Sequence, residues 1–207
     1  QDNLSDKGQD YLTRMLNAAV RAQTLINDLL SFSRVTTQAK PFVPTDLSHV
    51  MAGVLSDLEV RIEQTGATVD IAPLPTIDAD HTQMQQVFQN LLSNALKFHK
   101  PGIAPKIQVS VQRYPMGEKE VCELQVIDNG IGFDVKYCDR IFQPFQRLHG
   151  RKTYEGSGIG LAICRKVVRR HGGLLRAESQ PGEGATFIVI LPIQHFQQEE
   201  DNVLPAE

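Results

Sequence analysis

The stretch YEGSGIGLAIC (154–164) has the residue types that let a backbone approach an anion closely. Gly156, Gly158 and Gly160 precede an apolar run of helical character. Glycine has no Cβ atom, and a helix N-terminus that follows it presents free amides and a partial positive charge. The P-loop pattern GxxxxGK[ST] is absent, and the third glycine falls one position early for the dinucleotide fingerprint GxGxxG. The loop therefore predicts phosphate binding of another kind, with a simple tight turn as the alternative.

A second motif, NLLSNALKF (90–98), predicts a polar face on a helix. Asn90, Asn94 and Lys97 stand at positions i, i+4 and i+7, which lie on one side of a helix. Two carboxamides on an otherwise apolar face cost free energy unless a polar partner meets them. A divalent cation with phosphate oxygens is such a partner, because amide oxygens are hard ligands.

A third motif, DNGIGF (128–133), closes a predicted strand with a carboxylate. Asp128 at this strand end can accept a hydrogen bond from an exocyclic amine such as that of adenine. Gly130 and Gly132 follow it and allow the backbone to pass close to a flat ring.

Two further segments complete the pattern. The stretch IFQPFQRLHGRKTY (141–154) is polar and aromatic and is long enough for a mobile lid. GEGATF supplies Gly182, Gly184 and Thr186, which we expect beside the same pocket. Each motif alone is weak, and the five together in this order predict a specific nucleotide site.

The first 35 residues or so predict one long helix that would stand before this site. Apolar residues recur in steps of three and four at Leu12, Met15, Ala19, Ala22, Ile26 and Leu29. So broad a stripe suits a helical bundle, and we expect another chain or another helix to cover it. The alternative is a surface helix lying on its own domain.

The rest of the chain predicts helices combined with hairpins. We expect a helix from Asp46 or Ser48 to about residue 64, closed by Gly66, and one or two short strands within 67–78. A helix over 80–99, a hairpin over 106–130, a helix over 158–171 and a second hairpin over 174–193 follow. The fold class is α+β, a two-layer α/β sandwich whose mixed sheet is covered by helices on one face, preceded by one long bundle helix. The predicted divisions are 1–38 for the bundle helix, 42–193 for the nucleotide domain and 194–207 for a solvated tail.

Bulk composition excludes several classes of protein. With 41% apolar and 22% charged residues the chain is an ordinary globular one, and its net charge of −3 argues against nucleic-acid binding. No apolar stretch approaches the roughly 18 residues of a membrane span, and the polar first residues do not resemble a signal peptide. Three cysteines without CxxC spacing indicate reduced thiols, so we expect a cytoplasmic location and no membrane contact.

In their order these motifs resemble the N, G1, F, G2 and G3 boxes of sensor histidine kinases. The stretch RAQTLINDLLSFSRV is similar to the second helix of their dimerisation and phosphotransfer domain, so the resemblance covers about residues 10–193. The amino-acid sequence of residues 141–173 is most similar to that of the kinase modules of bacteriophytochromes and PAS-linked sensors. The resemblance implies a Bergerat-type ATP-binding fold, the cofactors ATP and Mg²⁺, a homodimer through the bundle helices and a response regulator receiver domain as partner.

The resemblance also implies roles for single residues. Asn94 would bind magnesium with support from Asn90, and Asp128 would accept a hydrogen bond from the adenine amine. Thr186 would close the adenine side of the pocket. The other implied nucleotide-binding positions are Lys97, Phe98, Gly130, Gly132, Phe145, Arg147, Gly156, Gly158, Gly160 and the amide of Leu161.

The resemblance implies a reaction whose acceptor we do not find in this sequence. Such kinases transfer the γ-phosphoryl group of ATP to a histidine in a motif like S-H-[ED]-x-x-x-P, and the first histidine here, His49, has no following acidic residue. We expect that motif upstream of Gln1, and we expect this chain to bind Mg–ATP without phosphorylating itself. Two alternatives remain: an ATPase of the gyrase and MutL superfamily, whose water-activating glutamate would stand at Asn90, and a non-catalytic nucleotide-sensing pseudokinase.

Overall fold

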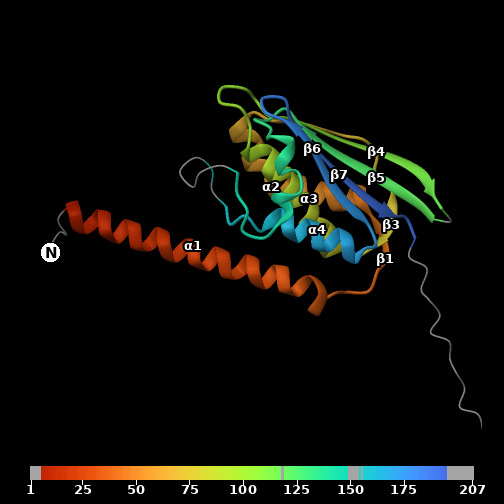
Figure 1. Cartoon of the computed structure of the whole chain (residues 1–207), viewed down its shortest axis with the longest axis horizontal. Coiled ribbons are helices and arrows are strands. Elements are labelled where there is room, and N and C mark those ends of the chain that lie inside the picture. Colours follow the sequence, from red (N-terminus) through yellow and green to blue (C-terminus); the bar gives the residue numbers. More distant parts are fainter. Residues whose placement is uncertain (1–5, 118, 149–153, 155, 195–207) are drawn as a thin grey trace, which may run out of the picture.

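The computed structural model describes residues 6–117, 119–148, 154 and 156–194, and each of its α-helices is followed by one or two strands (Figure 1). The helices are α1 (Asp6–Thr37), α2 (Leu47–Thr65), α3 (His81–Lys97) and α4 (Gly160–Arg170), with 3₁₀ turns η1 (Val135–Tyr137) and η2 (Arg140–Phe142). The strands are β1 (Val43–Asp46), β2 (Thr68–Ile71), β3 (Thr76–Ala79), β4 (Lys106–Met116), β5 (Lys119–Asp128), β6 (Leu174–Gln180) and β7 (Gly184–Pro192).

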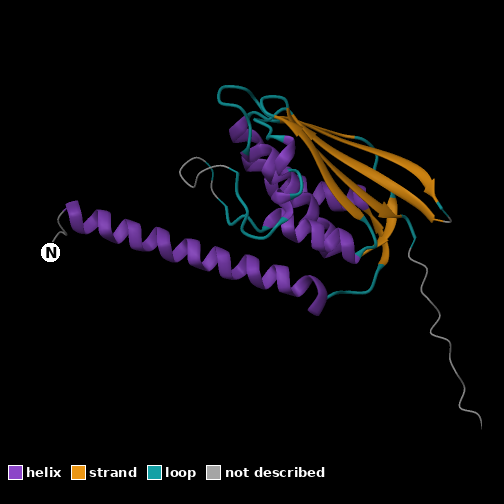
Figure 2. Ribbon diagram, in the orientation of Figure 1, coloured by secondary structure: helices purple, strands orange, loops and turns teal. Residues whose placement is uncertain are grey.

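A five-stranded mixed sheet forms one layer of the molecule. Its order is β2-β4-β5-β7-β6, with β2 parallel to β4 and every other neighbouring pair antiparallel. Helices α2, α3 and α4 cover one face of this sheet (Figure 2). The predicted two-layer sandwich with one long preceding helix is confirmed.

The core lies between this sheet face and the helices. Alternate residues of β5 and β7, such as Leu124 and Val189, point toward the helix layer and are fully buried. Leu91 and Leu92 of α3 meet them from the other layer and are equally buried. The polar face of α3 is left on the opposite side, which is where the predicted site lies.

Local signals at the ends of α2 and α3 act as the sequence predicts. Asp46 caps α2 by accepting the amide of Ser48 at 2.8 Å, and Gly66 ends it in the left-handed region with φ +62°. Asp80 caps α3 in the same way, with its Oδ1 accepting the amide of Thr82 at 3.1 Å.

Two details differ from the sequence-based expectation. Strand β1 is not predicted, because four residues that include a proline carry almost no strand signal; it pairs antiparallel with β3 in a small separate sheet. Helix α4 begins at Gly160 rather than at Gly158, because Gly158 has a φ of +78°, which a helix does not accommodate.

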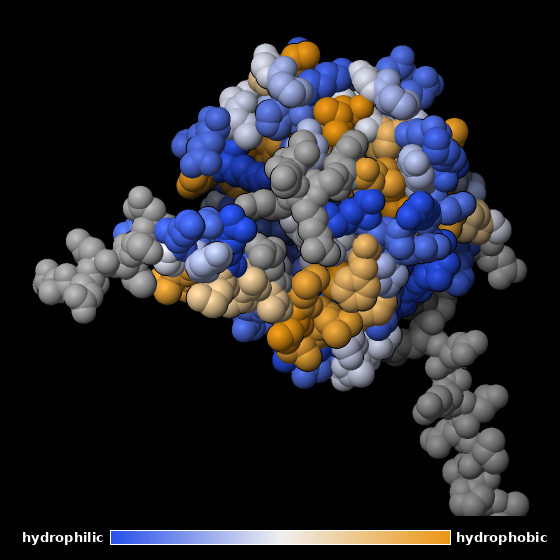
Figure 3. All heavy atoms as spheres, turned by 60° about the vertical axis from the view of Figure 1, so that its left-hand side comes forward, coloured by the Kyte–Doolittle hydropathy of each residue, from blue (hydrophilic) through white to orange (hydrophobic). Residues whose placement is uncertain are grey.

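Helix α1 packs on the domain only through its C-terminal end. Val35 is 3% exposed and Phe32 packs against the core, and α4 is the element that α1 contacts there. The rest of the apolar stripe is open, with Met15 62% and Ile26 54% exposed, and it forms the continuous apolar patch in the lower part of Figure 3. Covering of the stripe by another chain or helix stays a prediction. Within the described residues, no helix is long and apolar enough to cross a membrane.

The α2 assignment is testable with two glycines of opposite expected behaviour. Gly66→Ala should lower the free energy of unfolding by about 1 kcal/mol, because a Cβ atom is strained in the left-handed region even though the space is open. Gly53→Ala, inside the helix with nothing within 4 Å of the added atom, should raise it by roughly 0.4–1 kcal/mol. Urea unfolding of both variants checks this; a destabilised Gly53→Ala protein would contradict the helix.

Candidate nucleotide-binding site

One large cavity brings the predicted motifs together. Its volume is about 1600 Å³, and it lies among α3, the loop after β5, the residues before α4 and the inner side of α1. The predicted site residues that line it are Asn90, Asn94, Lys97, Phe98, Asp128, Gly132, Phe145, Arg147, Gly156, Gly158, Gly160 and Leu161. Motifs separated by up to 70 positions in the sequence thus face a single space.

Asp128 is held in place by two main-chain amides at the end of β5. Its Oδ1 accepts the N–H of Gly130 at 2.8 Å and that of Ala185 at 3.3 Å. Burial raises the pKa of this carboxyl group, while the two amides and the charge of Lys100 oppose that shift. No hydrogen bond from the described part of the chain reaches Oδ2. This oxygen is therefore available to a donor on a ligand, as the sequence predicts for an amine.

The two glycines after Asp128 are required by packing within the protein. A Cβ atom at Gly130 would lie 2.5 Å from the carbonyl oxygen of Phe98, and one at Gly132 would lie 2.0 Å from that of Gln180. Ile131 donates its amide to the Phe98 carbonyl at 2.9 Å, so this loop rests on the end of α3. Gly132 lines the cavity, whereas Gly130 does not. The backbone at these two glycines approaches the ends of α3 and β6 closely. Its close approach to a flat ligand ring stays a prediction.

The polar face of α3 contacts the glycine loop directly. A Cβ atom at Gly160 would lie 2.6 Å from Oδ1 of Asn90, and one at Gly156 would lie 3.0 Å from Nζ of Lys97. Asn90 also donates to the carbonyl of Gln86 at 2.9 Å. The glycines thus allow the loop to lie against Asn90 and Lys97, which a larger residue would push away.

Lid residues and the glycine loop are joined by one guanidinium group. Arg147 donates from Nη1 to the carbonyl oxygen of Gly156 at 2.6 Å and from Nη2 to that of Tyr154. The Tyr154 ring lies 4.9 Å from the Phe98 ring, and Phe145 is 55% exposed with a φ of +63°. Contact of Arg147 and Phe145 with a nucleotide stays a prediction. His149, the histidine of the segment 141–154, lies outside the described residues.

Thr186, like Gly130, is a predicted site residue that does not line the cavity. It pairs with Ile127 of β5, and successive residues of a strand point to opposite faces, so its side chain lies on the sheet face away from Asp128. Ala185, which pairs with Asp128, lines the cavity in its place. The sequence alternation alone could not decide this, because the choice depends on the register of β5 with β7.

One cysteine thiol, that of Cys164, is buried near the site. Cys164 of α4 is fully buried behind Asn90, and burial raises its pKa to about 12. A thiol in such surroundings stays protonated and is a poor nucleophile. Among the described residues no three His, Cys, Asp or Glu side chains cluster as a metal site either.

Comparison with known proteins agrees with this geometry. The family model described as "Histidine kinase-, DNA gyrase B-, and HSP90-like ATPase" matches residues 79–195. Cyanobacterial phytochrome A of Nostoc sp. is 42% identical over 98% of this chain and 26% of its own length. Phytochrome-like protein Cph1 of Synechocystis sp. is 40% identical over 92% of this chain and 25% of its own length. The chain thus spans about a quarter of these relatives.

Solved structures show the same fold. Full-length ShkA in complex with AMPPNP superposes with a TM-score of 0.68 at 26% identity, covering 92% of this chain and 40% of ShkA. The mycobacterial sensor histidine kinase MprB gives a TM-score of 0.61 at 26% identity, covering 75% of this chain and 99% of that one.

Asp128→Asn should separate nucleotide binding from folding. The amide Oδ1 can still accept both main-chain N–H groups, but Nδ2 would present a donor to the ligand's amine, so affinity for Mg–AMPPNP should fall at least about tenfold. Calorimetric titration measures this, with the exposed Asp70→Asn as control. Unchanged affinity in Asp128→Asn would contradict the assignment.

The stability of Asp128→Asn gives an independent check. The pKa of the Asp128 carboxyl group is raised in the folded protein. Such a group lowers the free energy of unfolding as the pH rises from its pKa in the unfolded chain to its pKa in the folded protein. Above that window the variant should therefore be at least as stable as the parent, and the difference should shrink as pH falls through it. Thermal unfolding at several pH values measures this; a variant clearly less stable at neutral pH would contradict it.

Proposed function

Because the chain belongs to the family of histidine kinase-, DNA gyrase B- and HSP90-like ATPases, as a sensor histidine kinase ATP-binding domain, we propose that its cavity binds Mg–ATP for phosphoryl transfer to a histidine. That histidine would stand on a helix that packs beside α1, and the phosphoryl group would pass on to an aspartate of a response regulator. The observation that carries the proposal is a single cavity lined both by the nucleotide motifs and by α1.

The shape of the cavity supports transfer to a group on a neighbouring helix. Asn17, Leu25 and Asp28 of α1 line the same space as Asn94 and Lys97 of α3. A groove therefore runs from the phosphate-facing residues to the inner side of α1. These α1 residues lie on the face of the helix opposite Met15 and Ile26, so a helix packed on the apolar stripe would leave the groove open.

The donor set fits magnesium held together with phosphates. Asn94 lines the cavity, and its side-chain amide has no hydrogen bond to any described residue, so its oxygen is available as a ligand. Mg²⁺ commonly takes one or two protein oxygens and completes its shell with waters and substrate phosphates. When bound, it would neutralise the charge on the phosphate oxygens.

The chain's own residues would mainly hold and orient the nucleotide. Oδ2 of Asp128 would accept a hydrogen bond from the adenine amine. Lys97 would contact phosphate oxygens, which would also bind the main-chain amides at the start of α4. Phosphoryl transfer depends on such positioning and charge stabilisation more than on protein chemistry at the reacting atoms.

The hydrolytic alternative lacks a base at the position where gyrase and MutL carry one. Asn90 stands there, and a carboxamide does not take a proton from water. The pseudokinase alternative is disfavoured because the implied metal and adenine residues, Asn94 and Asp128, both line the cavity.

Asn94→Ala should remove the effect of magnesium on nucleotide binding. Titration of AMPPNP with and without Mg²⁺ should show that the metal strengthens binding to the parent, with about a tenfold or greater loss of this gain in the variant. Gln89→Ala, another amide side chain of α3 that lines the cavity, is the matched control. Equal magnesium dependence in all three proteins would argue against Asn94 as the ligand.

Transfer itself is tested with a longer protein in which a helix carrying an S-H-[ED]-x-x-x-P motif is joined ahead of this chain. Incubation with labelled ATP should give acid-labile, base-stable phosphoprotein, and Asp128→Asn should abolish it. The 207-residue chain alone should give no phosphohistidine, since none of its six histidines stands in an S-H-[ED]-x-x-x-P sequence. Fast release of inorganic phosphate with no phosphoprotein would favour the ATPase alternative.

A further inference from the structure

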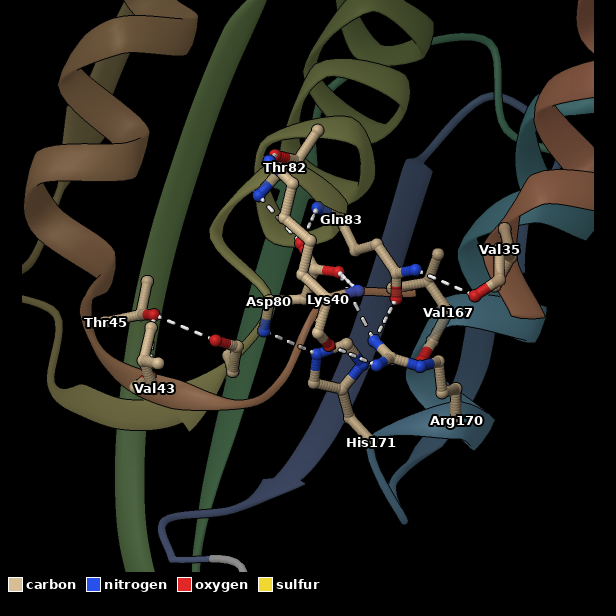
Figure 4. Close-up of polar contacts among 11 residues, drawn as sticks. Val35, Lys40, Val43, Thr45, Asp80, Thr82, Gln83, Val167, Arg170 and His171 are labelled. Carbon is tan, nitrogen blue, oxygen red and sulfur yellow. Dashed lines mark hydrogen bonds and ion pairs between the residues drawn. The ribbon is translucent and has the colours of Figure 1, made fainter. Parts of the chain in front are cut away.

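The end of α1 is held by polar side chains of the ATP-binding domain (Figure 4). Three of them donate to main-chain carbonyl oxygens: Lys166 to Phe32 at 2.8 Å, Gln83 to Val35 at 2.8 Å and Arg170 to Lys40 at 2.5 Å. The last carbonyl groups of a helix lack intrahelical partners, and cations are favourable at this end. Only Val35 is among the last four residues of α1, whereas Phe32 lies earlier in the helix and Lys40 lies beyond its end. The domain thus binds the C-terminal part of α1 and the segment that follows it.

A single carboxylate, that of Asp80, links the segment after α1 to α3. Oδ1 of Asp80 caps α3, while its Oδ2 accepts the amide of Lys40 at 3.0 Å and lies 3.5 Å from Nη1 of Arg170. Nη1 of Arg170 also donates to Oε1 of Gln83 at 2.8 Å. Asp80 is 2% exposed, so one buried group fixes both the start of α3 and the segment after α1.

His171, at the end of α4, holds the main chain of Asp80 in place. Its Nε2 accepts the amide of Asp80 at 3.1 Å, and its Nδ1 lies 2.8 Å from the carbonyl oxygen of Val167. Because a carbonyl oxygen can only accept, Nδ1 carries the proton and the ring is neutral. The Phe42 ring lies 4.4 Å from this imidazole and 4.5 Å from the Arg170 guanidinium, so the segment after α1 is bound by ring contacts as well.

These residues lie at the far ends of the two helices that face the nucleotide. Helix α4 begins beside the glycine loop and ends at Arg170, about 16 Å away by the rise of an 11-residue helix. Helix α3 begins at Asp80 and carries Asn94 and Lys97 near its other end. Asp80 and Gln83 line the α1 end of the same cavity, so the position of α1 is set at the end of the cavity opposite Asn94 and Lys97.

We propose that Gln83, Lys166 and Arg170, together with Asp80, form a latch that positions α1 so that the nucleotide cavity opens onto the groove beside it. Because the latch binds main-chain atoms, it fixes the helix end independently of the side chains of α1. When the latch opens, α1 can pivot at residues 38–42. The proposed nucleotide-binding residues of α3, the β5 end and the glycine loop keep their positions. The part that concerns phosphoryl transfer rests on the proposed function, whereas the latch itself does not.

Hydrogen exchange tests the latch in the 207-residue chain. In the double variant Lys166→Met and Arg170→Met, amides of residues 32–42 should exchange about tenfold faster, while those of α3 and the sheet keep their rates. Arg169→Met, an exposed neighbour in the same turn, is the matched control and should behave as the parent. Unchanged exchange over 32–42 in the double variant would overturn the latch.

A second variant covers the case in which the double variant loses its fold. Phe32→Ala with Val35→Ala removes the apolar half of the contact from the α1 side and leaves every domain residue in place. Because the latch binds main-chain carbonyl oxygens, which these substitutions keep, exchange over 32–42 should stay close to that of the parent. Exchange about tenfold faster in this variant would show that apolar packing holds α1 and would overturn the latch.

Kinetics of the longer protein test the positioning role. In Arg170→Met the KM for ATP should stay at the parent's value, while kcat for phosphohistidine formation falls about tenfold, since a freed α1 presents its groove in many orientations. Faster exchange with unchanged kcat would overturn this role. Failure of the parent to bind Mg–AMPPNP would instead refute the proposed function, and the exchange result would still decide the latch.

Discussion

The site depends on the pairing that ends at Asp128, where a buried carboxylate is held by main-chain amides from its own loop and from β7. The register that places Ala185 opposite Asp128 brings that second amide within reach. It also explains Gly184, where a Cβ atom would lie 1.9 Å from the Asp128 carbonyl oxygen. Because both amides bind Oδ1, the other oxygen keeps its capacity for a ligand. The proposed recognition of adenine is in this sense a property of the sheet.

The phosphate side of the cavity depends on two helices rather than on the sheet. Asn90 and Lys97 of α3 meet the glycine loop at the start of α4, and the loop can lie there only because Gly156 and Gly160 carry no side chain. The opposite ends of both helices meet at Asp80 and Arg170 around the end of α1. One pair of helices therefore carries the proposed nucleotide-binding residues at one end and the attachment of α1 at the other.

The sequence predicts those features that local patterns encode. The caps at Asp46 and Gly66, the helical face of Asn90 and Asn94, and both hairpins follow from spacing within a few residues. The face of Thr186 could not be predicted, because it depends on the pairing of two strands about 60 positions apart. Nor could the latch, in which Arg170 meets Lys40 across 130 positions and the groups bound are carbonyl oxygens, which every residue has.

Amide NMR during titration of the 207-residue chain with Mg–AMPPNP tests the central claim most directly. The account predicts the largest shift changes at Gly156, Gly158, Gly160 and Leu161 and at the amides of Gly130 and Ala185 that hold Asp128, with Lys40 unchanged. Changes concentrated on the open face of the sheet, around Thr186 and Ile188, would contradict it, as would no saturable change at all.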